Sequence, residues 1–200
     1  MKNEVSLEGN AFIGFKKPTF SAKLSSSYFH ISNYIVGKPL SGLVPMTIGA
    51  NGVKQYEALD FATILNVILE TEVQLLDELK WRTQLGYNCG KDFENVNLPF
   101  MSPFSYQTSL SYLKDRFSAD VAVIGNTKHK DFSPVYGETK TPDYVILNAG
   151  LGYNFVFGKN KIYTTIGAEN VLDRFYTTYS DWNKIPRPGR NFYVNVNYSF

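Results

Sequence analysis

Apolar and polar residues alternate along most of this chain, a pattern typical of β-strands with one apolar and one polar face. The alternation is clearest in the second half. It occupies residues 81–87, 104–112, 117–123, 145–155, 162–172 and 192–200, and it recurs less regularly at residues 5–15 and 20–28. Turn residues separate these runs, so the sequence predicts an all-β protein.

Residues 60–79 are ambiguous on local pattern. Helical spacing and strand alternation both fit the apolar residues of this segment, among them Phe61, Leu65 and Leu69. Taken alone, the local pattern favours a helix.

The connections between the runs alternate between short and long. Short turns are expected near residues 16–18, 74–78, 114–115 and 158–160, and long segments at residues 38–52, 89–103, 126–142 and 173–189. In an antiparallel meander this order places every long loop at one end of the sheet, as in outer-membrane β-barrels. Strands of about ten residues, tilted by ~40°, also match an apolar band of roughly 25 Å.

Counting residues 60–73 as a strand, the sequence predicts an antiparallel up-and-down meander of about nine strands. A soluble β-sandwich or a small ligand-binding β-barrel is the alternative, because one buried and one solvated face also gives an alternating pattern. Such proteins have no reason to carry long loops at one end only.

Composition and charge narrow the possible functions. The chain has 20 Lys and Arg against 18 Asp and Glu, which leaves no basic surface for nucleic acid. It contains 14 Tyr and 15 Phe, residues that are enriched in strands and at membrane interfaces. The start, MKNEVSLEGN, is polar and unlike a signal peptide, so we expect the targeting segment of any exported parent protein to be missing.

No pattern of catalytic or metal-binding residues is found. His30 and His129 lie far apart, and the single cysteine, Cys89, has no partner for a disulfide or a zinc site. We expect His129 to be a solvated loop residue, His30 to lie near a strand end without a ligand role, and Cys89 to be incidental at the start of a loop. The sequence therefore predicts neither an enzyme nor a cofactor.

The most specific motifs lie toward the C-terminus. Residues 167–176, GAENVLDRFY, resemble the G-[VA]-E-N-[LV]-[FL]-D segment of TonB-dependent outer-membrane receptors. Residues 181–194, DWNKIPRPGRNFYV, resemble the last extracellular loop of that family, and residues 141–148, TPDYVILN, resemble one of its strand openings. The residues that carry the family motif are Gly167, Glu169, Asn170, Asp173, Pro188, Gly189 and Arg190.

The last run resembles the terminal strand that bacterial outer-membrane proteins present to their assembly machinery. Its apolar residues are Phe192, Val194, Val196, Tyr198 and Phe200.

The resemblance covers nearly all of residues 1–200 and implies a partial receptor barrel domain without a plug domain. It implies the C-terminal part of a transmembrane β-barrel of about 22 strands. Residues 62–69 resemble a long strand of the family, with Asn66 and Ile68 in place of its usual Gly and Glu, so we expect a strand there. With about nine antiparallel strands, the first and last run the same way, and clean closure of this chain alone is not expected.

The function implied is energised uptake of a scarce nutrient, such as a ferric siderophore, haem or cobalamin, across the bacterial outer membrane. The implied partners are outer-membrane lipid, a plug domain, the remaining barrel strands, the TonB complex, the assembly machinery and the nutrient, with no nucleic acid. Tyr176, Tyr179, Trp182 and Arg187 are candidate extracellular ligand contacts. An aromatic girdle for the first three, and turn geometry for Arg187, are the favoured explanations.

The alternation also predicts how an arginine introduced on either face would affect membrane insertion. Leu147 falls on the apolar face and Asn148 on the polar face. An arginine on the lipid face of a barrel costs roughly 2–4 kcal/mol at mid-depth and little on the other face. We expect Leu147→Arg to impair insertion of the parent barrel and Asn148→Arg to be tolerated. Equal effects of the two on folding into lipid would contradict the face assignment.

Overall fold

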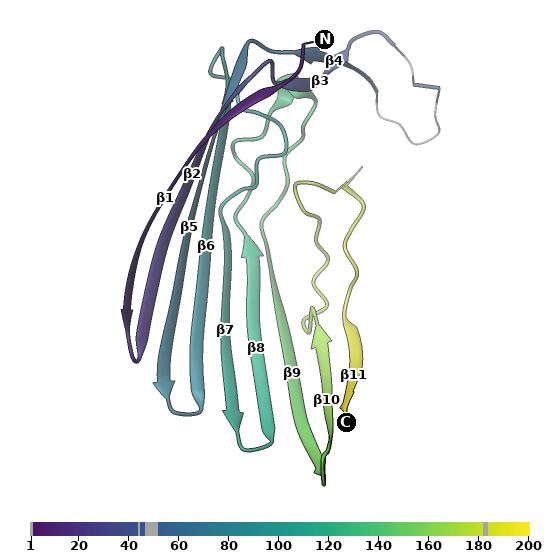
Figure 1. The fold of residues 1–200 in the computed structure, drawn as a ribbon. Coiled ribbons are helices and arrows are strands. Elements are labelled where there is room, and N and C mark those ends of the chain that lie inside the picture. The colour runs from purple at the N-terminus through teal and green to yellow at the C-terminus, as the bar shows by residue number, and fades with distance from the viewer. Residues whose placement is uncertain (1, 44, 47–51, 182–183) are drawn as a thin grey trace.

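A single antiparallel sheet of nine strands forms most of the molecule (Figure 1). The computed structural model describes residues 2–43, 45–46, 52–181 and 184–200. The strands are β1 (Val5–Lys17), β2 (Phe20–Ser32), β5 (Phe61–Leu76), β6 (Leu79–Asp92), β7 (Ser105–Lys114), β8 (Phe117–Asn126), β9 (Tyr144–Phe157), β10 (Asn160–Glu169) and β11 (Asn191–Ser199). They lie side by side in chain order, so the predicted all-β meander is confirmed.

The pairing register places apolar residues of each strand opposite apolar residues of the neighbouring strands. Leu110 of β7 lies opposite Trp81 of β6 and Val121 of β8, and Val121 in turn lies opposite Ala149 of β9. Leu151 of β9 then pairs with Ile166 of β10. Because facing residues point to the same side of a sheet, the apolar positions join into one continuous apolar face.

The other side of the sheet is a polar face. Arg82 and Lys80 of β6 both contact the Glu72 carboxylate of β5, at 2.7 and 3.0 Å. Asp120 lies opposite Ser111 on the same side, and Glu169 lies opposite Asn191. These positions agree with the predicted alternation.

Residues 61–76 form a strand rather than the helix that their local pattern favours. β5 pairs along its length with β2 on one side and β6 on the other, and this pairing outweighs the local preference. Ile68 lies opposite Ser25 and Gly86, on the polar face, as the resemblance implied. The strand expected from the resemblance is therefore confirmed.

Three details differ from the sequence-based expectation. The connection between β2 and β5 contains a two-stranded hairpin, β3 (Ile35–Leu40) with β4 (Val53–Ala58), that the sequence did not reveal. Cys89 lies inside β6, not at the start of a loop. β10 ends at Glu169 rather than at residue 172, because Asn170 takes a left-handed conformation, with φ 48°, that breaks the strand.

All long connections lie at one end of the sheet and all short turns at the other (Figure 1). β1 and β11 both run from the long-loop end to the short-turn end, and within the described residues they do not pair with each other. The expected lack of antiparallel closure is therefore confirmed for these residues. Apart from β3 and β4, every described strand belongs to one sheet, which excludes a two-layered sandwich among them.

The described part of the chain has no helix long and apolar enough to cross a membrane. Its short 3-10 helix, η1 (Pro134–Tyr136), lies in the connection between β8 and β9.

Buried side chains gather at the long-loop end instead of in the middle of the sheet. The buried apolar residues are Val36, Leu59, Ala62, Leu98, Tyr136 and Ile146. Mid-sheet side chains such as Leu110 and Val121 stay 44% and 45% exposed. The packed interior of this chain is thus made largely by its long connections.

Candidate functional site

The long connections pack against one another into a loop cap, which we define as the described residues of segments 33–60, 93–104, 127–143 and 170–190. An apolar cluster of Val36, Leu59 and Tyr136, with Tyr34 and Val96 against it, holds the β3–β4 hairpin on the η1 turn. The Lys54 ammonium adds a 2.7 Å hydrogen bond to the backbone oxygen of Tyr136. The hairpin is therefore docked rather than projecting freely.

Tyr136 also joins the cap to the end of β6. Its hydroxyl donates a 2.6 Å hydrogen bond to Asp92 Oδ2, in a buried position. The other carboxylate oxygen of Asp92 accepts bonds from the backbone N–H groups of Glu94 and Val96, at 2.9 and 2.8 Å. Burial, and then the Asp92 carboxylate, raise the pKa of Tyr136 far above its usual value, so the phenol remains a donor.

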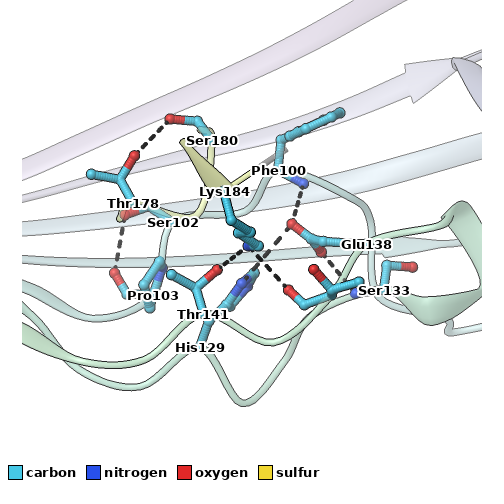
Figure 2. A network of polar contacts seen from close by, with 11 residues as sticks. Phe100, Ser102, Pro103, His129, Ser133, Glu138, Thr141, Thr178, Ser180 and Lys184 are labelled. Carbon is cyan, nitrogen blue, oxygen red and sulfur yellow. Dashed lines mark hydrogen bonds and ion pairs between the residues drawn. The ribbon is translucent and has the colours of Figure 1, made fainter. Parts of the chain in front are cut away.

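The buried carboxylate of Glu138 joins the β6–β7 connection to the β8–β9 connection (Figure 2). One of its oxygens accepts a 3.2 Å bond from the Phe100 N–H, and the other accepts a 2.8 Å bond from the Ser133 N–H. Lys184, from the connection between β10 and β11, donates to the Thr141 hydroxyl in the same network. The network thus ties together three segments that are distant in the sequence.

His129 lies at the centre of this network and is 2% exposed. Its Nδ1 is 3.9 Å from Glu138 Oε1, too far for a hydrogen bond, and within the described residues neither ring nitrogen has a hydrogen-bond partner. Aromatic rings of Tyr179 and Phe132 meet it edge-on, at centroid distances of 6.1 and 6.3 Å. The expectation that His129 is a solvated loop residue was wrong, because the loops bury it although its lysine neighbours stay exposed.

Burial is the main cause that lowers the pKa of His129, and the nearby Lys184 charge lowers it further. Glu138 and Asp131 act in the opposite direction without overcoming burial. The imidazole is therefore held neutral in the packed cap.

A second polar centre, at Asn170, fixes the turn after β10. The Asn170 side chain accepts a 2.8 Å bond from the Arg174 N–H and donates bonds to the backbone oxygens of Arg174 and Pro188, at 2.8 and 3.4 Å. Its own N–H donates to Asn148 Oδ1 of β9, at 2.9 Å. One buried asparagine thereby joins β9, the turn and the approach to β11.

Asp173 and Gly189 complete this turn. Asp173 Oδ1 accepts a 2.8 Å bond from the Arg190 N–H, at the residue before β11 begins. A Cβ at position 189 would lie 2.6 Å from the same oxygen, so only glycine leaves room for the bond. Gly167 has a similar role, because a Cβ there would lie 2.5 Å from the ring of Tyr193.

Comparisons with known proteins agree with this geometry. No family model matches the sequence, and no curated protein matches it either. Solved structures do match in fold. The copper transporter OprC superposes with a TM-score of 0.84 at 20% identity, over 98% of this chain and 32% of that one. The chain has the fold of a TonB-dependent receptor barrel.

Two further solved receptors show the same relationship. The siderophore receptor PirA from Acinetobacter baumannii has a TM-score of 0.72 at 18% identity, over 98% of this chain and 32% of that one. The ferric enterobactin receptor PfeA from Pseudomonas aeruginosa has a TM-score of 0.70 at 19% identity, over 96% and 31%. The chain therefore spans about a third of the length of these structures.

In this fold, the residues of the predicted motif fall into one structural unit. Asn170, Asp173, Pro188, Gly189 and Arg190 surround the turn described above, and Gly167 lies beneath Tyr193. Glu169 contacts the Asn191 side chain at 3.4 Å. Their contacts hold β10 and β11 in place.

The candidate ligand contacts have partners within their own loop. The Arg187 guanidinium lies 2.6 Å from the Asp181 carboxylate. The backbone N–H of Arg187 donates a 2.9 Å hydrogen bond to the backbone oxygen of Tyr176. The Tyr176 ring packs against Tyr144 with the ring planes tilted by 34°, and Tyr179 packs edge-on against His129. Trp182 lies outside the described residues. A ligand role for these residues stays a prediction.

Burial opposes ionisation of Asp181, but the Thr178 N–H and the Arg187 guanidinium together hold its pKa below the usual range. The pair therefore stays charged and braces this part of the loop cap.

The remaining predicted residues lie elsewhere in the fold. Phe192, Val194, Val196 and Tyr198 project from the apolar face of β11 and are exposed, as is Phe200 beyond it. His30 stacks on Phe61, at 5.1 Å, on the apolar side of the sheet. Neither it nor Cys89 joins the loop cap.

Among the described residues, no group of three or more His, Cys, Asp or Glu side chains is placed to hold a metal ion. The loop cap offers aromatic rings, neutral hydrogen-bonding groups and braced charges.

Lowering the pH should loosen the loop cap through His129. An opened loop releases the imidazole to its ordinary pKa of 6.5, so the open state binds more protons and the packed state loses stability as pH falls below that value. We expect the protection factors of the amides in residues 127–143, each corrected for the intrinsic exchange rate at its pH, to fall from about pH 7 to about pH 5. His129→Leu should abolish this fall, and an unchanged pH dependence of the protection factors in that variant would contradict the assignment.

Asn170→Ala should destabilise the turn after β10. The substitution leaves buried backbone groups without hydrogen-bond partners. It also places an alanine in the left-handed region, which alanine adopts less readily than asparagine. Together we expect these effects to cost about 1–3 kcal/mol. Exchange at the Arg174 and Arg190 amides should rise roughly 5- to 100-fold. Asn195→Ala on the exposed face of β11 is the matched control and should leave both amides unchanged.

Proposed function

We propose that this chain forms part of the wall and of the outer loops of a TonB-dependent receptor that takes up a scarce nutrient through the bacterial outer membrane. The observation that carries the proposal is the continuous apolar face, which extends across the nine strands and has a packed loop cap at one end only. The fold shared with OprC, PirA and PfeA supports it.

The apolar face needs a partner other than water. Leu151 and Ile166, which face each other on neighbouring strands, are 48% and 51% exposed, and the whole face is lined by similar side chains. Soluble monomers rarely expose contiguous apolar patches of more than a few hundred Å². Lipid chains cover such a face without a second protein layer, and the sheet pairs the backbone groups of its inner strands, as a membrane requires.

The polar face would line the interior of the barrel. Near the short-turn end it has a hollow of ≈ 580 Å³ whose lining includes Lys23, Glu70, Glu72 and Arg82. A charged, concave surface of this kind supports contact with a plug domain or with water. In the complete receptor, TonB would act on that plug, and the apolar residues of β11 would be presented to the assembly machinery.

The loop cap would face outward and contribute to nutrient capture. The similar structures are named for copper, for ferric enterobactin and for siderophores, which supports a metal ion or metal chelate as the nutrient class. Tyr176, Tyr179, Trp182 and Arg187 are proposed contacts. Binding and passage require no covalent step, and we propose no catalytic residue.

The face assignment gives the first test, with a better control than Asn148. Because Asn148 Oδ1 accepts the Asn170 N–H, Asn148→Arg would disturb the turn as well as the face. Gln107 pairs with Ile124, beside the pair formed by Val123 and Leu147, so it lies at the same height on the polar face. It is the matched control.

Leu147→Arg should reduce the fraction of chain that becomes protease-protected in lipid vesicles, by about 2 kcal/mol in insertion free energy. Gln107→Arg should change it little. A water-soluble wild-type monomer that ignores both vesicles and micelles would refute the membrane proposal.

Nutrient binding is tested on the vesicle-inserted chain. Ferric enterobactin, a second ferric siderophore and Cu²⁺ are added separately, and saturable quenching of intrinsic fluorescence at micromolar concentrations is expected for at least one. Vesicles whose loops have been removed by protease provide the control, since they keep the strands. Equal quenching with and without loops would contradict a role for the loop cap.

A further inference from the structure

The turn between β7 and β8 places an arginine among aromatic rings at the short-turn end of the apolar face. Residues 115–116 form the turn, with Asp115 at φ 51°. The backbone oxygen of Arg116 accepts a 2.8 Å hydrogen bond from the Asn154 N–H, so the turn is fixed against β9 as well. The position of Arg116 relative to β9 is therefore set by the sheet.

Two shallow hollows flank this arginine, and Arg116 and Tyr153 line both of them. One, of ≈ 410 Å³, is completed by Phe155, Val156 and Phe157 of β9. The other, of ≈ 370 Å³, is completed by Tyr112, Phe117, Lys114 and Asp115. Each hollow thus combines aromatic rings with the shared Arg116 cation, and the second hollow also contains the Lys114 and Asp115 charges.

The charge on Arg116 is not used within the chain. The neighbouring Lys114 ammonium lies 3.7 Å from the Glu78 carboxylate of the β5–β6 turn, whereas Arg116 forms no ion pair among the described residues. Asp115 is the acidic neighbour in the same turn. A guanidinium offers a planar set of donors that matches phosphate oxygens.

We propose that Arg116 and its two flanking hollows bind one phospholipid of the adjoining leaflet. The phosphate lies against the guanidinium, and one acyl chain lies in each hollow, on either side of Tyr153. The inference rests on the proposed membrane function, because it requires the apolar face to meet lipid. It goes beyond that function in assigning a specific lipid site to named residues.

Aromatic residues at a membrane interface have a simpler role, since they stabilise the depth of a protein in the bilayer without selecting a lipid. That role does not require the phosphate. A shared cation between two hollows that are both lined by aromatic rings favours instead a ligand with one anionic group and two chains. The two explanations therefore predict different dependence on the phosphate and on Arg116.

The test measures lipid adducts by native mass spectrometry on the full chain folded in detergent. Phosphatidylglycerol is titrated against diacylglycerol with the same acyl chains, which lacks the phosphate. We expect a single phosphatidylglycerol adduct that forms at lower lipid concentration than any diacylglycerol adduct. Inorganic phosphate should not displace it, because the chains contribute to binding.

Arg116→Gln should raise the concentration of phosphatidylglycerol needed for half occupancy by about fivefold or more, the effect typical of one basic residue near an anionic lipid surface. Arg116→Lys should restore part of the affinity. Lys159→Gln, which removes the same charge from the next short turn, is the matched control and should change little.

Several outcomes would overturn the lipid site: equal adducts with diacylglycerol, displacement by inorganic phosphate, no effect of Arg116→Gln, or an equal effect of Lys159→Gln. A chain that is protease-protected in vesicles yet shows one of these outcomes refutes the lipid site and leaves the receptor proposal intact. A chain that never enters micelles or vesicles refutes the receptor proposal itself.

Discussion

The ladder of backbone hydrogen bonds between neighbouring strands is the interaction on which the rest of this structure depends. It satisfies the backbone polar groups of long strands whose side chains on one face are mostly apolar. β1 and β2 pair without interruption from Val5 opposite Ser32 to Lys17 opposite Phe20. The one register shift between β5 and β6 lies between Gln74 and Leu76, beside a turn. A slip of one residue anywhere else would exchange the two faces.

The ladder also determines where irregular structure occurs in the chain. Connections at the short-turn end are tight, whereas those at the other end are long enough to pack on one another. There, two buried carboxylates are satisfied by backbone N–H donors rather than by opposite charges alone. Glu138 accepts two such bonds, and Asp92 two more in addition to the Tyr136 hydroxyl. Buried carboxylates are tolerated in this way.

Local patterning was enough to predict most of the sheet. Strand alternation and the order of short and long connections set the faces and the end that carries the loops. The same reasoning failed for residues 61–76, because two neighbouring strands, rather than local spacing, decide their conformation. The resemblance identified Asn170, Asp173 and Gly189 as residues of a motif. Only the geometry explains them, as a hydrogen-bonded turn in which a glycine makes room for a carboxylate.

The loop cap could not be predicted from the sequence. Its central contacts join residues that no local period relates, such as Tyr136 with Asp92 and Lys184 with Thr141. His129 is the clearest example. Between two lysines it has the surroundings of a surface residue, and only the meeting of separate connections buries it. Tertiary packing decides whether side chains of this kind are buried. The loop segments show no alternation of apolar and polar residues from which that burial could be predicted.

The direction of the two edge strands, β1 and β11, limits what can pair with them. Both point away from the loop cap, so antiparallel pairing at either edge requires a strand that points toward the loop cap. A second copy inserted in the same orientation offers none. A second antiparallel sheet can close a barrel with this one only if both of its outermost strands point toward the loop cap. Such a sheet has an odd number of strands.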